Sequence, residues 1–148
     1  EKESYAPNLT ENEFIRQSIE YGFHSLEVGR TPFHENVRWF IEQLYPDTSI
    51  EEWSKKVWMT ESRFCSIDSE IGKVSGENKS LCAKERLFPQ IQLFPNATTV
   101  LFGNKSQKRA HNLIPNAITA YALAPPGANH KPAKPSWLKA IDIVKSKR

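Results

Sequence analysis

The stretch "ATTVLFGNKSQKRAHNLIPNAITAYALA", residues 97–124, decides the fold of this chain. It opens with a continuous apolar run over 97–103, which is typical of a parallel strand covered on both faces. Gly103 turns this strand into a helix predicted over 104–113, and a second apolar strand is predicted over 117–124. Strands that alternate with helices indicate a parallel sheet. The sequence therefore predicts an α/β fold, a three-layer α/β/α sandwich with a short, mostly parallel central sheet.

The other predicted elements follow from hydrophobic spacing and from helix breakers. Helices are expected over 10–21, 34–45, 80–94 and 135–146, with a short helical turn over 49–54 and a further strand over 56–65. Pro89 should bend the helix that it interrupts. Residues 66–80 are polar and predict a loop. Residues 2–6 are short and polar for a strand, so either they are the stub of a longer first strand or the sheet has only three good strands.

The first predicted helix has a recognisable start and end. Thr10 and Glu13 have the spacing of a capping box, and Gly22 is expected to end the helix. Pro46 is expected to stop the second helix. The residues expected to face the core are Phe14, Ile15, Ile19 and Tyr21 in the first helix, Val37, Phe40, Ile41 and Leu44 in the second, and Trp137, Ile141 and Ile143 or Val144 in the last.

Length and composition favour an ordinary globular chain. With 148 residues, a single domain over 1–148 is expected. The sequence has no apolar run of the roughly 20 residues that a membrane-spanning helix needs, and its charged N-terminus does not look like a signal peptide. We therefore expect a cytoplasmic monomer that makes no membrane contact.

The charge is distributed unevenly along the chain. Residues 104–148 carry nine Lys and Arg and a single acid, Asp142, whereas residues 1–103 have more acids than bases. A cationic region on a near-neutral body can be the footprint of a polyanion such as nucleic acid. For the three last cations, Lys145, Lys147 and Arg148, a solvated basic tail is the alternative.

The order of short motifs along the chain carries a family resemblance. The chain runs "YAPN" (5–8), "GRTPFHEN" (29–36), "VWMTESRFC" (57–65), a helix opened by Cys82 and ending in "QIQLFPN" (90–96), "TVLFGNKSQKR" (99–109) and "YALAPPGAN" (121–129). This order resembles the uracil-DNA glycosylase superfamily, especially its bacterial and archaeal branches. The resemblance extends from residue 5 to about residue 137 and implies a uracil-DNA glycosylase-like fold. It also implies that a nucleotide is flipped out of the DNA stack and that its base is excised.

At two catalytic positions of the family, this chain has a residue of a different type. Tyr5 falls where the family has the carboxylate or amide that activates water, and Asn8 is close enough to position water as an amide. Ala124 falls where the family has the histidine of its last motif. His130, six residues further on, is the candidate to replace that histidine and to stabilise the charge on the departing base.

The resemblance also assigns base-binding positions. Phe33 falls on the aromatic residue that stacks on the flipped base; as an alternative, Phe33 staples the start of its helix. Glu61 falls where the family has its base-reading asparagine. An ionised glutamate accepts hydrogen bonds but donates none, so it suits a base edge with donors or abolishes uracil reading. Ala124 would complete the same pocket.

The loop over 124–134 is expected to face DNA. Lys131 and Lys134 would contact phosphate there, and Lys105, Lys108 and Arg109 would join them if the predicted helix over 104–113 starts on the same face. Two functions stay open, a DNA glycosylase and a catalytically inactive module of the same fold that binds nucleic acid. A small-molecule hydrolase or nucleotide-binding α/β domain is a third alternative.

The two cysteines, Cys65 and Cys82, also have a counterpart in the resemblance. They match the later two cluster ligands of the family's iron–sulfur members, but the two upstream cysteines are missing. A cluster usually requires four thiolates. We therefore expect two buried free thiols, no metal and no cofactor.

Overall fold

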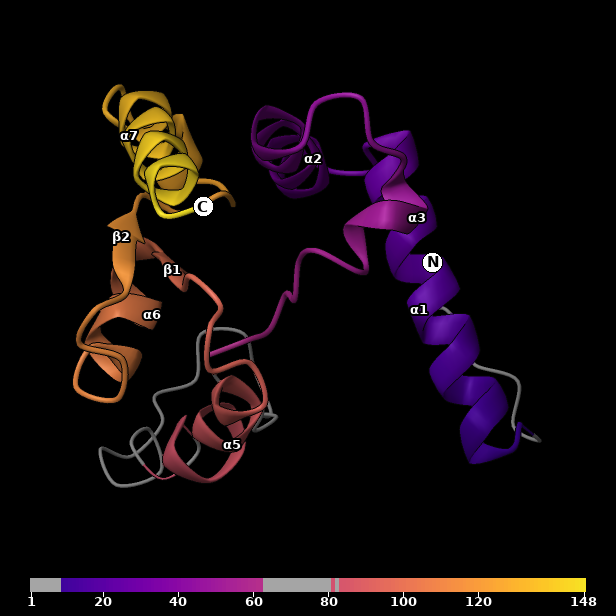
Figure 1. Ribbon diagram of the computed structural model, residues 1–148. Coiled ribbons are helices and arrows are strands. Elements are labelled where there is room, and N and C mark those ends of the chain that lie inside the picture. The colour runs from indigo at the N-terminus through magenta and orange to yellow at the C-terminus, as the bar shows by residue number, and fades with distance from the viewer. Residues whose placement is uncertain (1–8, 63–80, 82) are drawn as a thin grey trace. The chain divides into compact units, whose positions relative to one another are not determined.

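The computed structural model describes residues 9–62, 81 and 83–148. The chain divides into two compact units, Glu1–Lys56 and Val57–Arg148. The first unit is helical in its described residues, and the second contains a parallel pair of strands with helices (Figure 1). None of the described helices is both long and apolar enough to cross a membrane.

The first unit is built from α1 (Glu11–Val28), α2 (Pro32–Leu44) and α3 (Ile50–Trp53). The capping box expected at the start of α1 is confirmed, because the hydroxyl of Thr10 accepts the Glu13 N–H and the Glu13 carboxylate accepts the Thr10 N–H at 2.8 Å. Hydrogen bonds from the Thr10 side chain and backbone lower the pKa of the Glu13 carboxyl. The cap is therefore complete above the ordinary glutamate pKa and is lost as the pH falls through the lowered value.

The end and the apolar face of α1 differ from the prediction. The helix continues through Gly22 and ends at Gly29, which adopts the left-handed conformation with φ 62°. A glycine within a helix weakens it by only about 1 kcal/mol relative to alanine, so the helix passes through it, whereas a left-handed glycine ends a helix well. The residues expected to be buried on α1 are exposed, namely Phe14, Ile15, Ile19 and Tyr21. The buried residues of α1 are Ser25 and Leu26, near its C-terminal end.

The second helix, α2, agrees with the prediction. Its expected core residues are all buried, namely Val37, Phe40, Ile41 and Leu44. Arg38 joins this helix to α1, because its Nη1 donates to the carbonyl oxygen of Glu27 at 2.8 Å and its Nε donates to Glu42 at 2.8 Å. The hydrogen bond and charge of Glu42 raise the pKa of the Arg38 guanidinium.

The second unit contains the strand–helix–strand segment that decides the fold. β1 (Val100–Phe102) leads directly into α6 (Gly103–Ala110), and β2 (Ile118–Ala120) pairs parallel to β1 with Leu101 opposite Thr119. A short 3-10 turn, η2 (Gly127–Asn129), and the last helix, α7 (Ala133–Ser146), follow. The unit is therefore of mixed α/β type with parallel strands, as predicted, although each strand is shorter than its apolar run.

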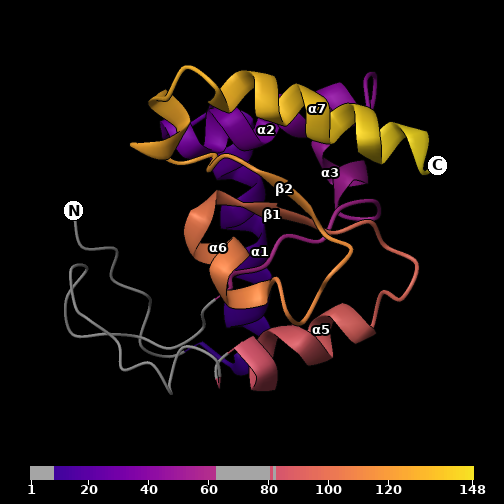
Figure 2. The same ribbon diagram turned by 90° about the vertical axis from the view of Figure 1, so that its left-hand side faces the viewer.

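The two helices that follow the strands cover different sides of the pair. α7 lies on one side and α6 on the other (Figures 1 and 2). Ile118 and Ala120 share one face of β2 and are buried, because α7 packs against this strand. The buried residues of α7 are Ala133, Trp137, Ala140, Ile141 and Val144, which confirms Trp137 and Ile141 and, of the two alternatives Ile143 and Val144, selects Val144. On the α6 side, Leu101 and Ala110 form a core cluster with Leu87.

The segment before β1 departs from the prediction in two ways. The helix expected over 80–94 is described as a π-helical turn, η1 (Ala83–Leu87), followed by α5 (Phe88–Gln92). Pro89 lies in the first turn of α5, where its missing N–H costs no hydrogen bond, so it interrupts the helix as expected. The strand expected over 56–65 is absent from its described part, 56–62. There Trp58 packs against Phe94, which follows α5, and Thr60 donates a hydrogen bond to Gln90 of α5. Residues 2–6, 63–65 and 66–80, for which a strand stub, the end of that strand and a loop are predicted, lie outside the described residues.

Gly22 and Gly29 provide a matched test of how α1 ends. A Cβ at Gly22 meets no atom within 4 Å, so Gly22→Ala should raise the free energy of unfolding by about 0.5–1 kcal/mol. At Gly29 the backbone is left-handed and a Cβ would lie 3.0 Å from Glu35 Cγ, so Gly29→Ala should lower that free energy by about 1–2 kcal/mol. Urea unfolding followed by circular dichroism measures both changes. Equal effects of the two substitutions would contradict a helix end at Gly29.

Candidate nucleic-acid interface

The carboxyl ends of β1 and β2 meet at one edge of the second unit, because the strands are parallel. Gly103 starts α6 there with φ 79°, and a Cβ added to it would lie 3.0 Å from the Cβ of Ala122. A Cβ on Gly127 would lie 2.8 Å from the same methyl group. The close contacts of Ala122 with both glycines bring the start of α6 and the start of the 124–134 loop together (Figure 2). In open α/β sheets, this edge is where ligands bind.

The first turns of α7 anchor the backbone at the end of β2. The N–H of Tyr121 donates to Ser136 Oγ at 3.0 Å, and Trp137 Nε1 donates to the carbonyl oxygen of Tyr121 at 2.9 Å. The ring of Tyr121 lies 6.3 Å from the imidazole of His130, at an interplanar angle of 49°. The loop between β2 and α7 is therefore held at both of its ends, and His130 is held against the residue that follows the strand.

A glutamine of α6 links the two strands near this edge. Gln107 Nε2 donates to the carbonyl oxygen of Ala120 at 2.9 Å and to that of Leu101 at 3.5 Å. Ser106 Oγ donates to the carbonyl oxygens of Phe102 and Gly103. These hydroxyl and amide groups fix α6 onto the ends of the strands. They are positioning residues that the sequence motifs did not reveal.

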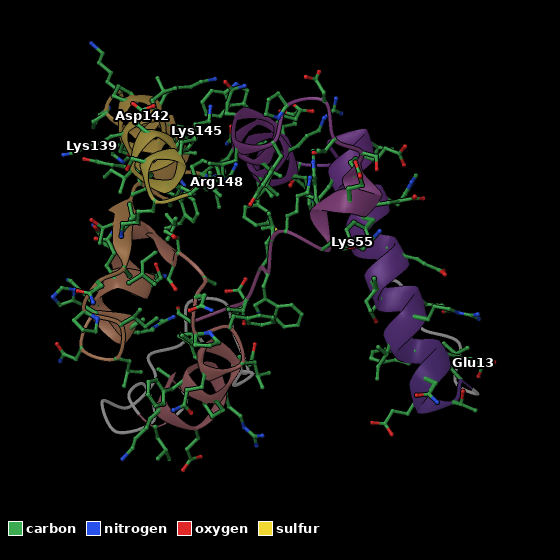
Figure 3. The ribbon with its side chains drawn as sticks, viewed as in Figure 1. Glu13, Lys55, Lys139, Asp142, Lys145 and Arg148 are labelled. Carbon is green, nitrogen blue, oxygen red and sulfur yellow. The ribbon has the colours of Figure 1, made fainter. Side chains whose placement is uncertain are left out.

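The cations expected to bind DNA lie on the elements that meet at this edge or extend from them. Lys105 and Lys108 are exposed on α6, and Lys131 and Lys134 are exposed on the loop and the start of α7. Arg109 is half-buried, and its Nη1 donates to Ser62 Oγ at 3.2 Å, which ties the 57–62 segment to α6. Further along α7, Lys139, Asp142 and Lys145 are exposed, and Arg148 is exposed after the helix ends; all four are labelled in Figure 3.

Two of the base-binding candidates lie in the second unit. Ala124 is exposed at the start of the loop, and its carbonyl oxygen accepts the N–H of Ala128 at 3.1 Å. Glu61 is exposed next to Ser62, the residue that contacts Arg109. The Ser62–Arg109 contact therefore places the Glu61 segment beside the C-terminal end of α6, whereas the start of this helix, at Gly103, lies at the carboxyl edge.

The remaining site candidates are not brought to this edge by any described contact. Phe33 is the second residue of α2, in the first unit, where its half-buried ring lies 5.5 Å from that of His34 in an edge-on arrangement. Phe33 follows the N-cap Thr31 and lies inside the helix, whereas a stapling residue precedes the cap, so the stapling alternative is wrong. The base-stacking role stays a prediction. Tyr5 and Asn8 lie outside the described residues, as do both cysteines.

Metal ligands do not gather within the described part of the chain. No group of three or more His, Cys, Asp or Glu side chains there is arranged to hold a metal ion. At the carboxyl edge, the described residues offer the exposed cations Lys105, Lys131 and Lys134, the imidazole of His130 and backbone groups.

Comparison with other proteins identifies no relative. No protein-family model, no curated protein and no solved structure matches this chain.

The contacts of Ala122 can be tested by a double-substitution cycle. Gly127→Ala should lower the free energy of unfolding by about 1–3 kcal/mol, because the new methyl group overlaps that of Ala122. Adding Ala122→Gly removes the overlap and should recover at least about 1 kcal/mol. Gly103→Ala should be rescued less by the same change, since its φ of 79° remains strained. Denaturant unfolding of the single and double variants gives the coupling energies, and a coupling of zero at Gly127 would contradict the packing.

Proposed function

We propose that the chain is a divergent uracil-DNA glycosylase-like protein, a single three-layer α/β/α domain that acts on DNA as a cytoplasmic monomer. The observation that carries the proposal is the packing of Gly103, Ala122 and Gly127, which gathers the start of α6 and the loop after β2 at the carboxyl edge of the strands. The order of the sequence motifs is the reason for proposing this family. We propose that a flipped base enters at this edge.

Charge at this edge supports DNA as the partner. Lys105 on α6 and Lys131 and Lys134 after β2 are exposed cations on elements that start or end there. Side chains of this kind bind the phosphate backbone without reading sequence. Within residues 104–148 only one acid, Asp142, opposes the nine cations. A phosphate chain can therefore approach this region with little repulsion.

The proposed reaction is hydrolysis of the bond between the sugar C1′ and the base nitrogen. The bonding electrons leave with the base, and water supplies the oxygen that replaces it at C1′. Glu61 accepts hydrogen bonds from donors on the base edge, and the imidazole of His130 stabilises the negative charge that develops on the base. The roles that the resemblance implies for Tyr5 and Asn8 (positioning water) and for Phe33 (stacking on the base) rest on the sequence alone.

A second candidate function rests on Ala124, the residue at the position of the family's last motif. Ala124 offers no polar side chain where the resemblance implies a histidine, and it is exposed. A protein that keeps the cationic edge but lacks that group would bind DNA without breaking a bond. The second candidate is therefore a catalytically inactive module of the same fold that binds nucleic acid.

An excision assay separates the two candidates. Single- and double-stranded oligonucleotides that contain uracil, hypoxanthine, xanthine or a mismatch are incubated with the protein, treated with alkali and analysed for strand cleavage, and binding is measured on the same samples. We expect an abasic product that is lost in His130→Ala and Glu61→Ala. Binding without product would favour the inactive module. Neither binding nor product would contradict both.

The cationic loop makes a quantitative prediction. Changing Lys131 and Lys134 together to alanine should remove two phosphate contacts, so the slope of log binding constant against log salt for duplex DNA should become shallower by about 1.8. The control changes Lys55 and Lys84, two exposed lysines outside the cationic region, by the same total charge. Fluorescence anisotropy over a salt series gives both slopes. Equal slopes for the two double variants would show that the loop does not contact DNA.

A further inference from the structure

A hollow of about 250 Å³ lies at the edge of the strand pair opposite to the loop. Thr98 and Thr99 lead into β1 and Ala117 leads into β2, and all three line the hollow. Because the strands are parallel, the hollow lies at their amino-terminal ends, whereas the 124–134 loop follows a carboxyl end. The two places are therefore separate parts of the second unit.

The walls of the hollow combine an apolar body with one charge. Ile91, Phe94 and Ile114 form apolar parts of the wall, and Asn116 adds an amide. Among the described residues that line the hollow, Lys147 at the C-terminal end of α7 is the charged one, and none of them carries a carboxylate. Such a lining favours a ligand that has an apolar face and a negative charge.

An exposed pair of aromatic rings continues from the wall of the hollow. The ring of Phe94 lies 5.6 Å from that of Trp58, at an interplanar angle of 35°. Phe94 is 41% exposed and Trp58 is 62% exposed. An indole that is this exposed lacks much of the burial that usually stabilises a tryptophan. Exposed apolar patches of this kind mark binding sites.

The tryptophan belongs to a segment that is fixed to α5. Thr60 Oγ1 donates to Gln90 Oε1 at 2.9 Å, and Gln90 Nε2 donates in turn to the carbonyl oxygen of Arg86 at 3.0 Å. These bonds tie Thr60 to α5, the helix that ends just before Phe94. The two rings therefore form a preorganised platform, which reduces the entropy lost when a planar group stacks on it.

We propose that this platform and hollow bind a nucleotide unit, with its base against the rings of Trp58 and Phe94 and its phosphate near Lys147. Every base has a flat face that stacks on aromatic side chains, and this contact tolerates any sequence. The hollow is smaller than the roughly 300–1,000 Å³ of sites that enclose a whole drug-sized ligand, so it receives one unit and leaves its neighbours in solvent. A single strand or a free nucleotide can supply that unit.

The exposed tryptophan reports directly on this site. Of the four tryptophans, Trp53 is 3% exposed, Trp137 is 2% exposed and Trp39 is half-buried, whereas Trp58 is 62% exposed. The quenching that is lost in Trp58→Ala is therefore the signal of this site. Titration of the full chain with thymidine 5′-monophosphate and with a short oligodeoxythymidylate should quench the fluorescence of Trp58. A much tighter complex with the oligomer identifies a single strand as the source of the unit, and equal affinities identify the free nucleotide.

Matched variants test the assignment by labelled-oligomer anisotropy. Lys147→Ala should weaken binding by about tenfold, as expected for one charge-assisted contact. Lys145→Ala, an exposed lysine of the same helix that lies outside the hollow lining, should leave affinity nearly unchanged. Trp58→Ala should weaken binding to the normal oligomer. It should not weaken binding to an oligomer of abasic sugar-phosphate units, which lacks bases to stack.

Three results would overturn the assignment. These are equal losses in Lys147→Ala and Lys145→Ala, equal affinity of normal and abasic oligomers for the unmodified protein, and no change in Trp58→Ala. The outcome is independent of the proposed function at the carboxyl edge. Binding of thymidine 5′-monophosphate that persists when Lys131 and Lys134 are alanine supports the hollow even if the excision assay fails.

Discussion

The second unit depends on the space left by two missing side chains around the methyl group of Ala122. Gly103 and Gly127 approach this group so closely that a Cβ on either would lie about 3 Å or less from it. The contacts join the beginning of α6, which follows β1, to the beginning of the loop that follows β2. Without them, the two strand ends would still be parallel, but their following segments could not converge. All of the proposed chemistry at this edge requires that convergence.

Hydrogen bonds then fix the positions of the segments that converge at this edge. The Gln107 amide reaches carbonyl groups of both strands, and the indole of Trp137 and the hydroxyl of Ser136 satisfy the backbone of Tyr121. Strands of three residues offer few ladder bonds, so side-chain donors carry an unusual share of the pairing. The polar residues of α6 and α7 thus have a structural task besides any contact with phosphate.

The sequence predicted well what depends on local contacts. The capping box of Thr10 and Glu13, the buried face of α2 and the strand–turn–helix at Gly103 each follow from a few neighbouring residues. It predicted poorly what depends on distant partners. The apolar face of α1 around Phe14 and Ile19 has the right spacing for a core, but spacing does not say whether another element covers it. The 56–65 run has strand-like composition, yet in its described part Trp58 packs on the ring of Phe94, which follows α5.

The candidate site, like the fold, was predicted in part from the sequence. The cationic loop and the start of α6 were found from charge and from the order of elements, and the structure brings these two together. Gln107 and Ser136 could not be found, because their partners are backbone carbonyl and amide groups that no motif records. The hollow beside Phe94 was missed for a related reason. It is lined by residues that precede the two strands, and these carry no signature of their own.

The anchoring of Tyr121 by the start of α7 has a consequence for how the protein can diverge. The two hydrogen bonds to the Tyr121 backbone close the chain between Tyr121 and α7 into a loop. They hold the base of this loop whatever residues form its tip. Beyond Gly127, residues 128–132 are mostly exposed, and lengthening a closed loop of this kind costs only about 0.6 kcal/mol per doubling. Insertions and exchanges at the tip can therefore accumulate while the strands and helices stay intact, so the ligand preference of this edge can evolve faster than the fold that supports it.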